Sequence, residues 1–188
     1  MVFKSLFSTP GKEDWGGWRL NIKAMNITLI GMAGVGKSSI GQEMARRLGF
    51  EFIDIDERIE NRYHSKLQEI VNQLGEQRFL HVEEEAVLGL GPIERCVVSP
   101  GGSVVYSERA IEFLKANSRV IFLDASFESI QKRIPNETTR GIIGLKHREL
   151  RELYHERRPL YQKHAELTIA LPDDLDRDTI VKEILQKL

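Results

Sequence analysis

The chain of 188 residues is 41% hydrophobic and 29% charged, and its 27 Lys and Arg nearly balance its 28 Asp and Glu, for a net charge of −1. A chain of this length can bury a core without a metal or a disulfide. The balanced charge argues against a nucleic-acid-binding protein whose affinity comes from neutralising phosphates. The sequence contains neither the roughly 20 consecutive apolar residues of a membrane span nor the apolar segment of a signal peptide. We therefore expect no nucleic-acid partner and no membrane partner.

The single cysteine, Cys96, lies in the apolar run at residues 96–99 and cannot form a disulfide within the chain. We interpret it as a core residue, with a reactive thiol as the less favoured alternative. This use of cysteine is typical of a reducing compartment, so we expect a cytoplasmic protein.

The first 24 residues differ in composition from the rest of the chain. They hold both tryptophans, Trp15 and Trp18, and two pairs of turn-forming residues, and they show no sustained helical or strand period. Met25 then directly precedes an apolar run of strand type. We expect residues 1–24 to be a flexible extension, or an upstream start outside the core, and residues 25–188 to form one domain.

From Ile27 onward, apolar strand-like runs alternate with segments of helical period, which predicts an α/β fold of three layers. The expected strands of the central parallel sheet, about five in number, are residues 27–30, 50–53, 96–99, 120–123 and 167–170. Two apolar helix faces are expected at Ile40, Met44, Ala45 and Leu48, and at Phe79, Val82 and Ala86. Residues 134–144 hold Pro135, Gly141 and Gly144 and form a candidate mobile loop.

A glycine-rich stretch follows the first expected strand and precedes a helix, which is the context of a phosphate-binding loop. Its pattern, Gly-x-x-x-x-Gly-Lys-Ser, lets backbone N–H groups converge on phosphate oxygens at a helix N-terminus. In such a loop the lysine reaches the β- and γ-phosphates and the serine hydroxyl binds Mg²⁺. The alternative is a glycine-rich turn that binds nothing. We predict a nucleoside triphosphate site made by Gly31, Ala33, Gly34, Val35, Gly36, Lys37, Ser38 and Ser39.

Two carboxylates, Asp54 and Asp56, come where the second expected strand ends. In open α/β sheets the ligand crevice lies at the carboxyl ends of the strands. One carboxylate can therefore serve Mg²⁺, and the other can orient an acceptor hydroxyl for in-line attack on a phosphoryl group. In the alternative, Asp56 only caps a helix at residues 57–63 and Asp54 is a solvated strand end.

From Ile27 almost to the carboxyl end, the chain resembles the shikimate kinase family. The resemblance rests on motifs in the family's order: Phe-x-Asp-x-Asp at residues 52–56, Gly75-Glu76 leading to Phe79 and Glu83, the glycine run Gly101-Gly102, a lid arginine, and Glu156-Arg157-Arg158-Pro159-Leu160-Tyr161. It implies a P-loop kinase fold with a mobile lid, and an enzyme that transfers a phosphoryl group from ATP to a small hydroxylated acceptor.

Carried over residue by residue, the resemblance implies a role for each motif. Lys37 would bind the phosphates, Ser38 and Asp54 would bind Mg²⁺, and Asp56 would bind the substrate hydroxyls and accept the transferred proton. Gly101 and Gly102 would face the substrate ring, and Arg157 would pair with its carboxylate. Arg133 would lie against the adenine, with an exposed helix-end cation as the alternative, and Arg140 of the lid would close over the phosphates.

Three positions depart from the family pattern. Leu80 stands where the family has a substrate arginine, Ser103 follows the two glycines, and Gly141 follows Arg140 where the family has proline. Loss of a charge-assisted hydrogen bond at position 80 would weaken carboxylate binding by roughly tenfold to a hundredfold. Glycine at position 141 raises the entropy cost of ordering the lid.

The residues and the resemblance together lead us to expect an ATP-dependent phosphotransferase that acts on shikimate, and we expect it to be a monomer. Two alternatives stay open, which are a related kinase with another hydroxylated acceptor and a nucleotide-binding paralogue without catalysis. The five histidines show no spacing typical of metal ligands.

Overall fold

The computed structural model describes residues 25–134, 141–146, 148–173 and 176–188. Within these ranges, five strands form one sheet in the order β2-β3-β1-β4-β5, and each neighbouring pair is parallel. The strands are β1 (Ile27–Ile30), β2 (Glu51–Asp54), β3 (Cys96–Ser99), β4 (Arg119–Ala125) and β5 (Leu167–Leu171). The predicted parallel sheet is confirmed.

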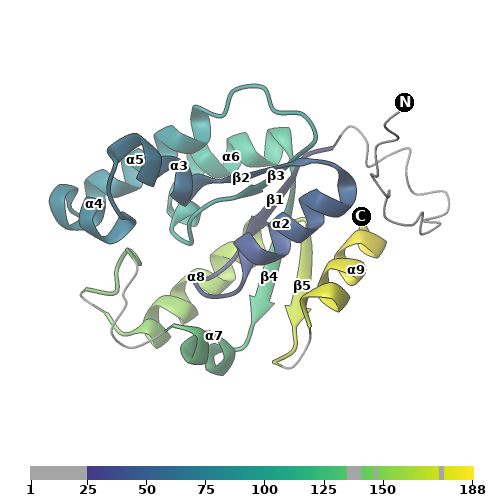
Figure 1. Cartoon of the computed structure of the whole chain (residues 1–188). Helices are drawn as coiled ribbons and strands as arrows, with labels where there is room; N and C mark the ends of the chain where they lie inside the picture. The colour runs from purple at the N-terminus through teal and green to yellow at the C-terminus, as the bar shows by residue number, and fades with distance from the viewer. Residues whose placement is uncertain (1–24, 135–140, 147, 174–175) are drawn as a thin grey trace, which may run out of the picture.

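Helices cover both faces of this sheet, as Figure 1 shows. They are α2 (Lys37–Leu48), α3 (Ile55–Tyr63), α4 (Leu67–Leu74), α5 (Glu76–Leu88), α6 (Glu108–Asn117), α7 (Phe127–Arg133), α8 (Leu150–His164) and α9 (Arg177–Lys187), with a short 3₁₀ turn η1 (Val104–Tyr106). Helix α2 packs on β2, β3 and α9, whereas α6 and α8 pack against β4. The α/β fold of three layers follows from this arrangement.

The strands form where the sequence is apolar because a parallel sheet with helices on both faces buries its central strands on both sides. All residues of β1 and β3 are buried, and the two strands pair over Ile27 with Val97 and Thr28 with Val98. Strands β2, β4 and β5 end one or two residues beyond the expected apolar runs. The added residues are held by backbone pairing, to which polar and apolar residues contribute alike.

Helix α2 packs closely against the sheet through a small residue. The predicted face is confirmed, since Ile40, Met44 and Ala45 are buried. A Cβ atom on Gly41 would lie 2.5 Å from the Phe52 ring of β2, so glycine lets the helix approach the strand. This contact sets how closely α2 lies to β2.

The strand order reverses at β1, which lies between β3 and β4. In open α/β sheets such a switch point marks the ligand crevice at the carboxyl ends of the strands. The segments that leave β1, β2 and β3 at this edge carry the glycine-rich loop, the two aspartates and the glycine run. Among the helices that the structure describes, none is long and apolar enough to cross a membrane.

Candidate active site

The glycine-rich loop turns sharply between β1 and α2. Gly31, Gly34 and Gly36 have φ angles of 147°, 77° and 103°, which side-chain-bearing residues rarely adopt. A Cβ atom on Gly31 would also lie 2.8 Å from the carbonyl oxygen of Leu123, so the loop passes directly over β4. The Val35 amide donates to the Met32 carbonyl at 3.3 Å and closes the turn. The loop therefore has the backbone geometry of a phosphate cradle at the N-terminus of α2.

Lys37, the first residue of α2, turns back over this loop. Its Nζ donates to the carbonyl oxygens of Gly31 at 3.0 Å and Met32 at 3.2 Å. Burial lowers the pKa of Lys37, and the charges of Asp56 and Asp54 act in the opposite direction. The ammonium group thus lies within the field of the two predicted carboxylates.

Ser38 and Asp54 meet at the start of α2. The Ser38 Oγ donates to Asp54 Oδ2 at 2.7 Å, and Asp54 Oδ1 accepts from the amides of Asp56 and Glu57. Asp54 is thus the cap of α3, so the alternative in which Asp56 is the cap is wrong. A hydroxyl and a carboxylate oxygen are ligands that Mg²⁺ accepts, and Mg²⁺ takes only one or two protein groups beside phosphates and water. The donor set fits this ion.

Asp56 and Glu83 bring two carboxyl groups to Gly101. A Cβ atom on Gly101 would overlap Glu83 Oε1 and lie 2.8 Å from Asp56 Oδ1. Among the described residues, these two buried oxygens have no hydrogen-bond partner. Burial raises the pKa of Asp56 to about 6 and that of Glu83 to about 7. A buried oxygen without a donor is costly, so both oxygens are suited to contact a hydroxyl group.

Ser103, which follows the glycine run, donates to Glu83 Oε2 at 2.6 Å in the protein interior. Its hydroxyl is therefore occupied by α5 and fixes one side of the Glu83 carboxyl. The short Ser103 side chain is only 5% exposed.

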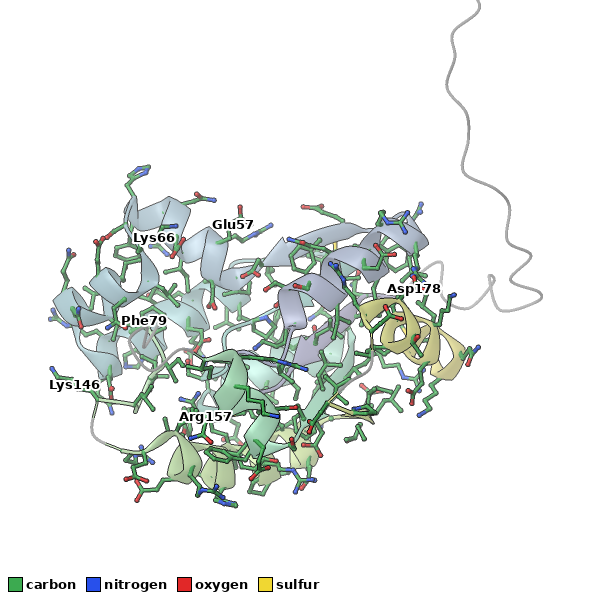
Figure 2. The ribbon with its side chains drawn as sticks, turned by 60° about the horizontal axis from the view of Figure 1, so that its bottom comes forward. Glu57, Lys66, Phe79, Lys146, Arg157 and Asp178 are labelled. Atoms are coloured by element: carbon green, nitrogen blue, oxygen red, sulfur yellow. The ribbon has the colours of Figure 1, made fainter. Side chains whose placement is uncertain are left out.

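Among the residues that the structure describes, Arg157 of α8 is the largest fully buried side chain, with 1% of it exposed. Its Nε donates to the Tyr106 hydroxyl at 3.1 Å and its Nη2 donates to the Ile143 carbonyl at 2.6 Å. Within the described part of the chain, no carboxylate lies within salt-bridge distance of this guanidinium. Figure 2 shows Arg157 on the α8 side of the molecule and Phe79 on the α5 side. A buried cation whose hydrogen-bond partners are neutral is suited to bind an anion.

Gly102 lies between the phosphate loop and Arg157, close to both. A Cβ atom at this position would lie 3.3 Å from the Ala33 amide nitrogen, 3.3 Å from the Tyr161 hydroxyl and 3.4 Å from Arg157 Nη1. The Tyr161 hydroxyl donates to the Gly102 carbonyl at 2.6 Å. The two glycines thus form a thin wall with Asp56 at Gly101 and Arg157 at Gly102.

The remaining predicted nucleotide residues lie beside the loop or outside the described ranges. Arg133 is exposed at the end of α7, and its Nη1 donates to the Val35 carbonyl at 3.3 Å. This position is compatible with a contact to the adenine and equally with an exposed cation at a helix end. Ser39 is exposed in the first turn of α2. Arg140 belongs to residues 135–140, which lie outside the described residues.

Position 80 has no cationic substitute nearby on its helix. Leu80 is half-buried and packs against the core, while Arg78 and His81 are exposed. Arg158, the neighbour of Arg157, donates to both carboxylate oxygens of Asp124 at 2.9 Å and 2.7 Å. The structure therefore leaves Arg157 as the buried cation of this wall.

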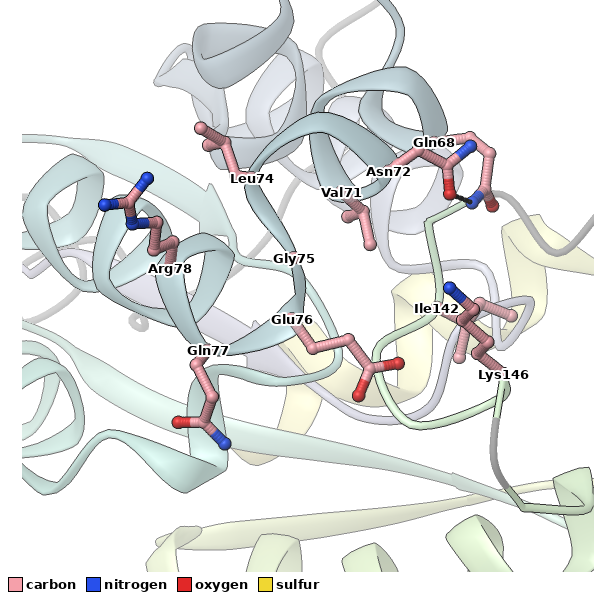
Figure 3. A pocket seen from close by; sticks show the side chains of 10 residues that line it. All are labelled: Gln68, Val71, Asn72, Leu74, Gly75, Glu76, Gln77, Arg78, Ile142 and Lys146. Carbon is pink, nitrogen blue, oxygen red and sulfur yellow. Dashed lines mark hydrogen bonds between the residues drawn. The ribbon is translucent and has the colours of Figure 1, made fainter.

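The segment at residues 141–144 is hydrogen-bonded to the helices α4 and α5. The Gly141 amide donates to Gln68 Oε1 at 2.7 Å, and the Gly144 amide donates to Glu76 Oε1 at 2.9 Å. A cavity of about 710 Å³ lies between these elements, and Figure 3 shows Glu76, Ile142 and Lys146 on its walls. The end of the candidate lid thus contacts the two helices that follow Asp56.

The site contains three side chains that sequence reasoning did not include among its functional residues: Glu83, Tyr106 and Tyr161. Glu83 had a signal, because it is an acid on the apolar face of α5, one turn after Phe79. Tyr161 ends the motif at residues 156–161, which signals its place in the family but not its contact with Gly102. Tyr106 has no local signal, since its role depends on a contact with Arg157 that only the fold creates.

Comparison with known proteins agrees with this geometry. A sequence model of the shikimate kinase family matches residues 33–188. The chain is 38% identical to a shikimate kinase of Thermodesulfovibrio yellowstonii over 140 residues, which is 73% of this chain and 81% of that one. It resembles the shikimate kinase of Acinetobacter baumannii in complex with shikimate, with a TM-score of 0.81 and 28% identity over 90% of this chain and 96% of that one. The corresponding TM-score for the Aquifex aeolicus shikimate kinase is 0.72, with 31% identity over 87% and 95% of the two chains. The chain is a kinase and belongs to the shikimate kinase family.

Proposed function

We propose that this protein transfers the γ-phosphoryl group of ATP to a hydroxyl of shikimate. The observation that carries the proposal is the pairing of Asp56, with an unpartnered oxygen at Gly101, and Arg157, a buried cation at Gly102. A small molecule with hydroxyls at one end and a carboxylate at the other matches this pair. The relative from Acinetobacter baumannii, whose structure holds shikimate, supports this choice of acceptor.

In the proposed complex, the loop at residues 31–38 holds the phosphates of ATP. The backbone amides and the N-terminus of α2 supply partial positive charge, and Lys37 moves from its carbonyl partners to the phosphate oxygens. Ser38 and Asp54 would hold Mg²⁺, which neutralises the charge that develops on the phosphoryl oxygens. Arg133 would lie against the adenine, and Arg140 would close over the phosphates.

Asp56 would orient the acceptor hydroxyl and take its proton. A general base works best when its pKa lies near the working pH, and burial brings the pKa of Asp56 to about 6. Because phosphoryl transfer needs positioning more than covalent chemistry, the fixed place of Asp56 in the first turn of α3 is the main contribution of this residue.

Arg157 would bind the acceptor carboxylate, which would provide the anionic partner that its surroundings do not supply. The guanidinium is already held by Tyr106 and the Ile143 carbonyl, so little rotational freedom is lost on binding. With Leu80 in place of a second cation, we expect weaker binding of shikimate than a pocket with two arginines would give.

The test is ADP release by the purified full chain with Mg-ATP, measured with and without millimolar shikimate. We expect strong stimulation by shikimate, and its loss in Lys37→Ala, which also excludes a contaminating kinase. No stimulation of a chain that binds ATP in calorimetry would overturn shikimate as the acceptor. Stimulation by another polyol of similar size would then favour a related kinase with a different acceptor. The replacement of the family's substrate arginine by Leu80 would explain that change of acceptor.

We also propose a cytoplasmic monomer. Every group named in the proposed site comes from one chain, so no second copy is needed to complete it. Cys96 is free and buried, in keeping with a reducing compartment. Light scattering of the purified chain tests the monomer, and a dimer that persists at low micromolar concentration would contradict it.

A further inference from the structure

Tyr106 holds Arg157 in two ways at once. Its hydroxyl accepts a hydrogen bond from Arg157 Nε at 3.1 Å, and its ring lies 5.0 Å from the guanidinium carbon. The first contact fixes the in-plane direction of the guanidinium, and the second is a cation–π contact with its centre. Arg157 Nη1 is then left beside Gly102, on the wall of the proposed acceptor site.

The position of Tyr106 is itself fixed by the chain that follows the glycine wall. Its amide donates to the Ser103 carbonyl at 2.9 Å within the turn η1, and the preceding residues Val104 and Val105 are buried. The turn and the core therefore hold the backbone between Gly102 and Tyr106 in place. Because Tyr106 follows the glycine wall closely in the chain and contacts Arg157, the position of the wall determines where the guanidinium of α8 lies.

The Tyr106 hydroxyl is also tied to the segment that follows the candidate lid. It donates to Glu156 Oε1 at 2.7 Å, and Glu156 Oε2 accepts from Arg148. Because the hydroxyl donates to Glu156, its oxygen is oriented to accept from Arg157. Each hydrogen bond supports the next one, and the chain of contacts ends at the guanidinium.

We propose that Tyr106 is a positioning residue for acceptor specificity, which fixes Arg157 so that this single cation can recognise the acceptor carboxylate. The inference rests on the proposed function. It follows from the composition of the wall, where Leu80 supplies no charge and Arg158 is bound to Asp124. Of the arginines that the structure describes along this wall, Arg157 is then the one left to hold the carboxylate, so its orientation before binding decides affinity.

Tyr106→Phe in the full chain tests this inference, since it keeps the ring and removes the hydroxyl. We expect KM for shikimate to rise about five- to tenfold, with kcat within about twofold and KM for ATP unchanged, because the lost contact serves ground-state binding. Tyr154→Phe is the matched control. Tyr154 lies on α8, as Arg157 does, but its hydroxyl donates to the Ala125 carbonyl, so we expect no change in KM for shikimate.

The methyl ester of shikimate separates positioning from a structural role. It lacks the anionic carboxylate, so kcat/KM for the ester, read from initial slopes, should be equal in wild type and Tyr106→Phe. An equal loss for acid and ester, or an unchanged KM for shikimate, would overturn the inference while the kinase activity stands. A wild-type chain that shikimate does not stimulate would overturn both the proposed function and the inference.

Discussion

Asp56 and Glu83 place their two unpartnered carboxyl oxygens around the same glycine, Gly101. Burial is the main cause of the raised pKa of each group, and the charge of Asp56 raises the pKa of Glu83 further. Lys37 acts in the opposite direction on both. The pair therefore gives this kinase two carboxyl groups that change protonation near neutral pH, and the first predictions concern them.

Asp56→Asn removes the proposed base and keeps the shape of the side chain. We expect kcat with shikimate to fall by about 10²- to 10⁴-fold, the usual contribution of a positioned general base. ATP affinity in calorimetry should stay unchanged, because the Asp54 and Lys37 groups remain. Glu57→Gln, an exposed neighbour in the same turn of α3, is the control and should retain activity. Wild-type turnover in Asp56→Asn would remove this residue from the mechanism.

The activity should depend on pH through the same group. The pKa of Asp56 is raised from 3.8 to about 6, so the carboxyl is ionised at pH 7 and becomes protonated as the pH falls through 6. A protonated carboxyl cannot take the proton of the acceptor, so kcat/KM for shikimate should decline below pH 6. A pH profile of initial rates measures this, and a flat profile down to pH 5 would contradict the assignment.

Glu83 should lower stability at high pH. Its pKa is raised from 4.5 to about 7, so the folded chain binds this proton more tightly than the unfolded chain does. Stability from this group is complete below pH 4.5 and is lost as the pH rises to 7. Relative to wild type, Glu83→Gln should therefore gain on the order of 2 kcal/mol in unfolding free energy between pH 5 and pH 8, as urea denaturation measures.

The control for this stability change is Glu85→Gln on the same helix. The Glu85 side chain is 64% exposed, and its Oε2 lies 3.6 Å from Nη1 of Arg62, which is also exposed. An ion pair on the surface contributes little, so Glu85→Gln should change stability little at either pH. If the two variants respond to pH alike, the buried Glu83 is not the cause.

Leu80→Arg should restore a second cation to the wall. An arginine at this position lies three residues before Glu83 on α5, which places it within reach of the unpartnered Glu83 oxygen and the acceptor carboxylate. We expect KM for shikimate to fall about tenfold, since a charge-assisted hydrogen bond is worth about 1.5–3 kcal/mol. Leu80→Gln, long and polar but neutral, should give no such gain. An unchanged KM in Leu80→Arg would indicate that Arg157 alone suffices.

A chain that begins at Met25 should keep the thermal stability and the activity of the full chain. The domain is fastened at Asn26, whose Nδ2 donates to the carbonyls of Ile93 and Asn117 at 2.8 Å and whose Oδ1 accepts from the Cys96 amide at 3.0 Å. Asn26→Ala in the shortened chain would leave these buried groups unpaired and should cost about 2–4 kcal/mol. A marked drop in melting temperature on removal of residues 1–24 alone would contradict the proposed boundary.

Much of this fold could be predicted because its signals are local. Apolar runs mark the five strands, since a parallel sheet covered on both faces requires them. The phosphate loop and the Asp54 and Asp56 pair could be found because fixed spacings along the backbone set their geometry. The bounds of β2, β4 and β5 were missed by one or two residues, since backbone pairing at strand ends carries no side-chain signal.

The tertiary structure decided which side chains share one wall. Gly102 and Arg157 are 55 residues apart in the chain, and the residues around each of them do not predict that the two lie in contact. The direction of the Ser103 hydroxyl toward Glu83, and of Arg158 toward Asp124, depends on which partners the packing brings within hydrogen-bond reach. The sequence by itself thus determined the fold and the phosphate loop, whereas the packing of α5 and α8 against the glycine wall decided how the acceptor pocket is charged.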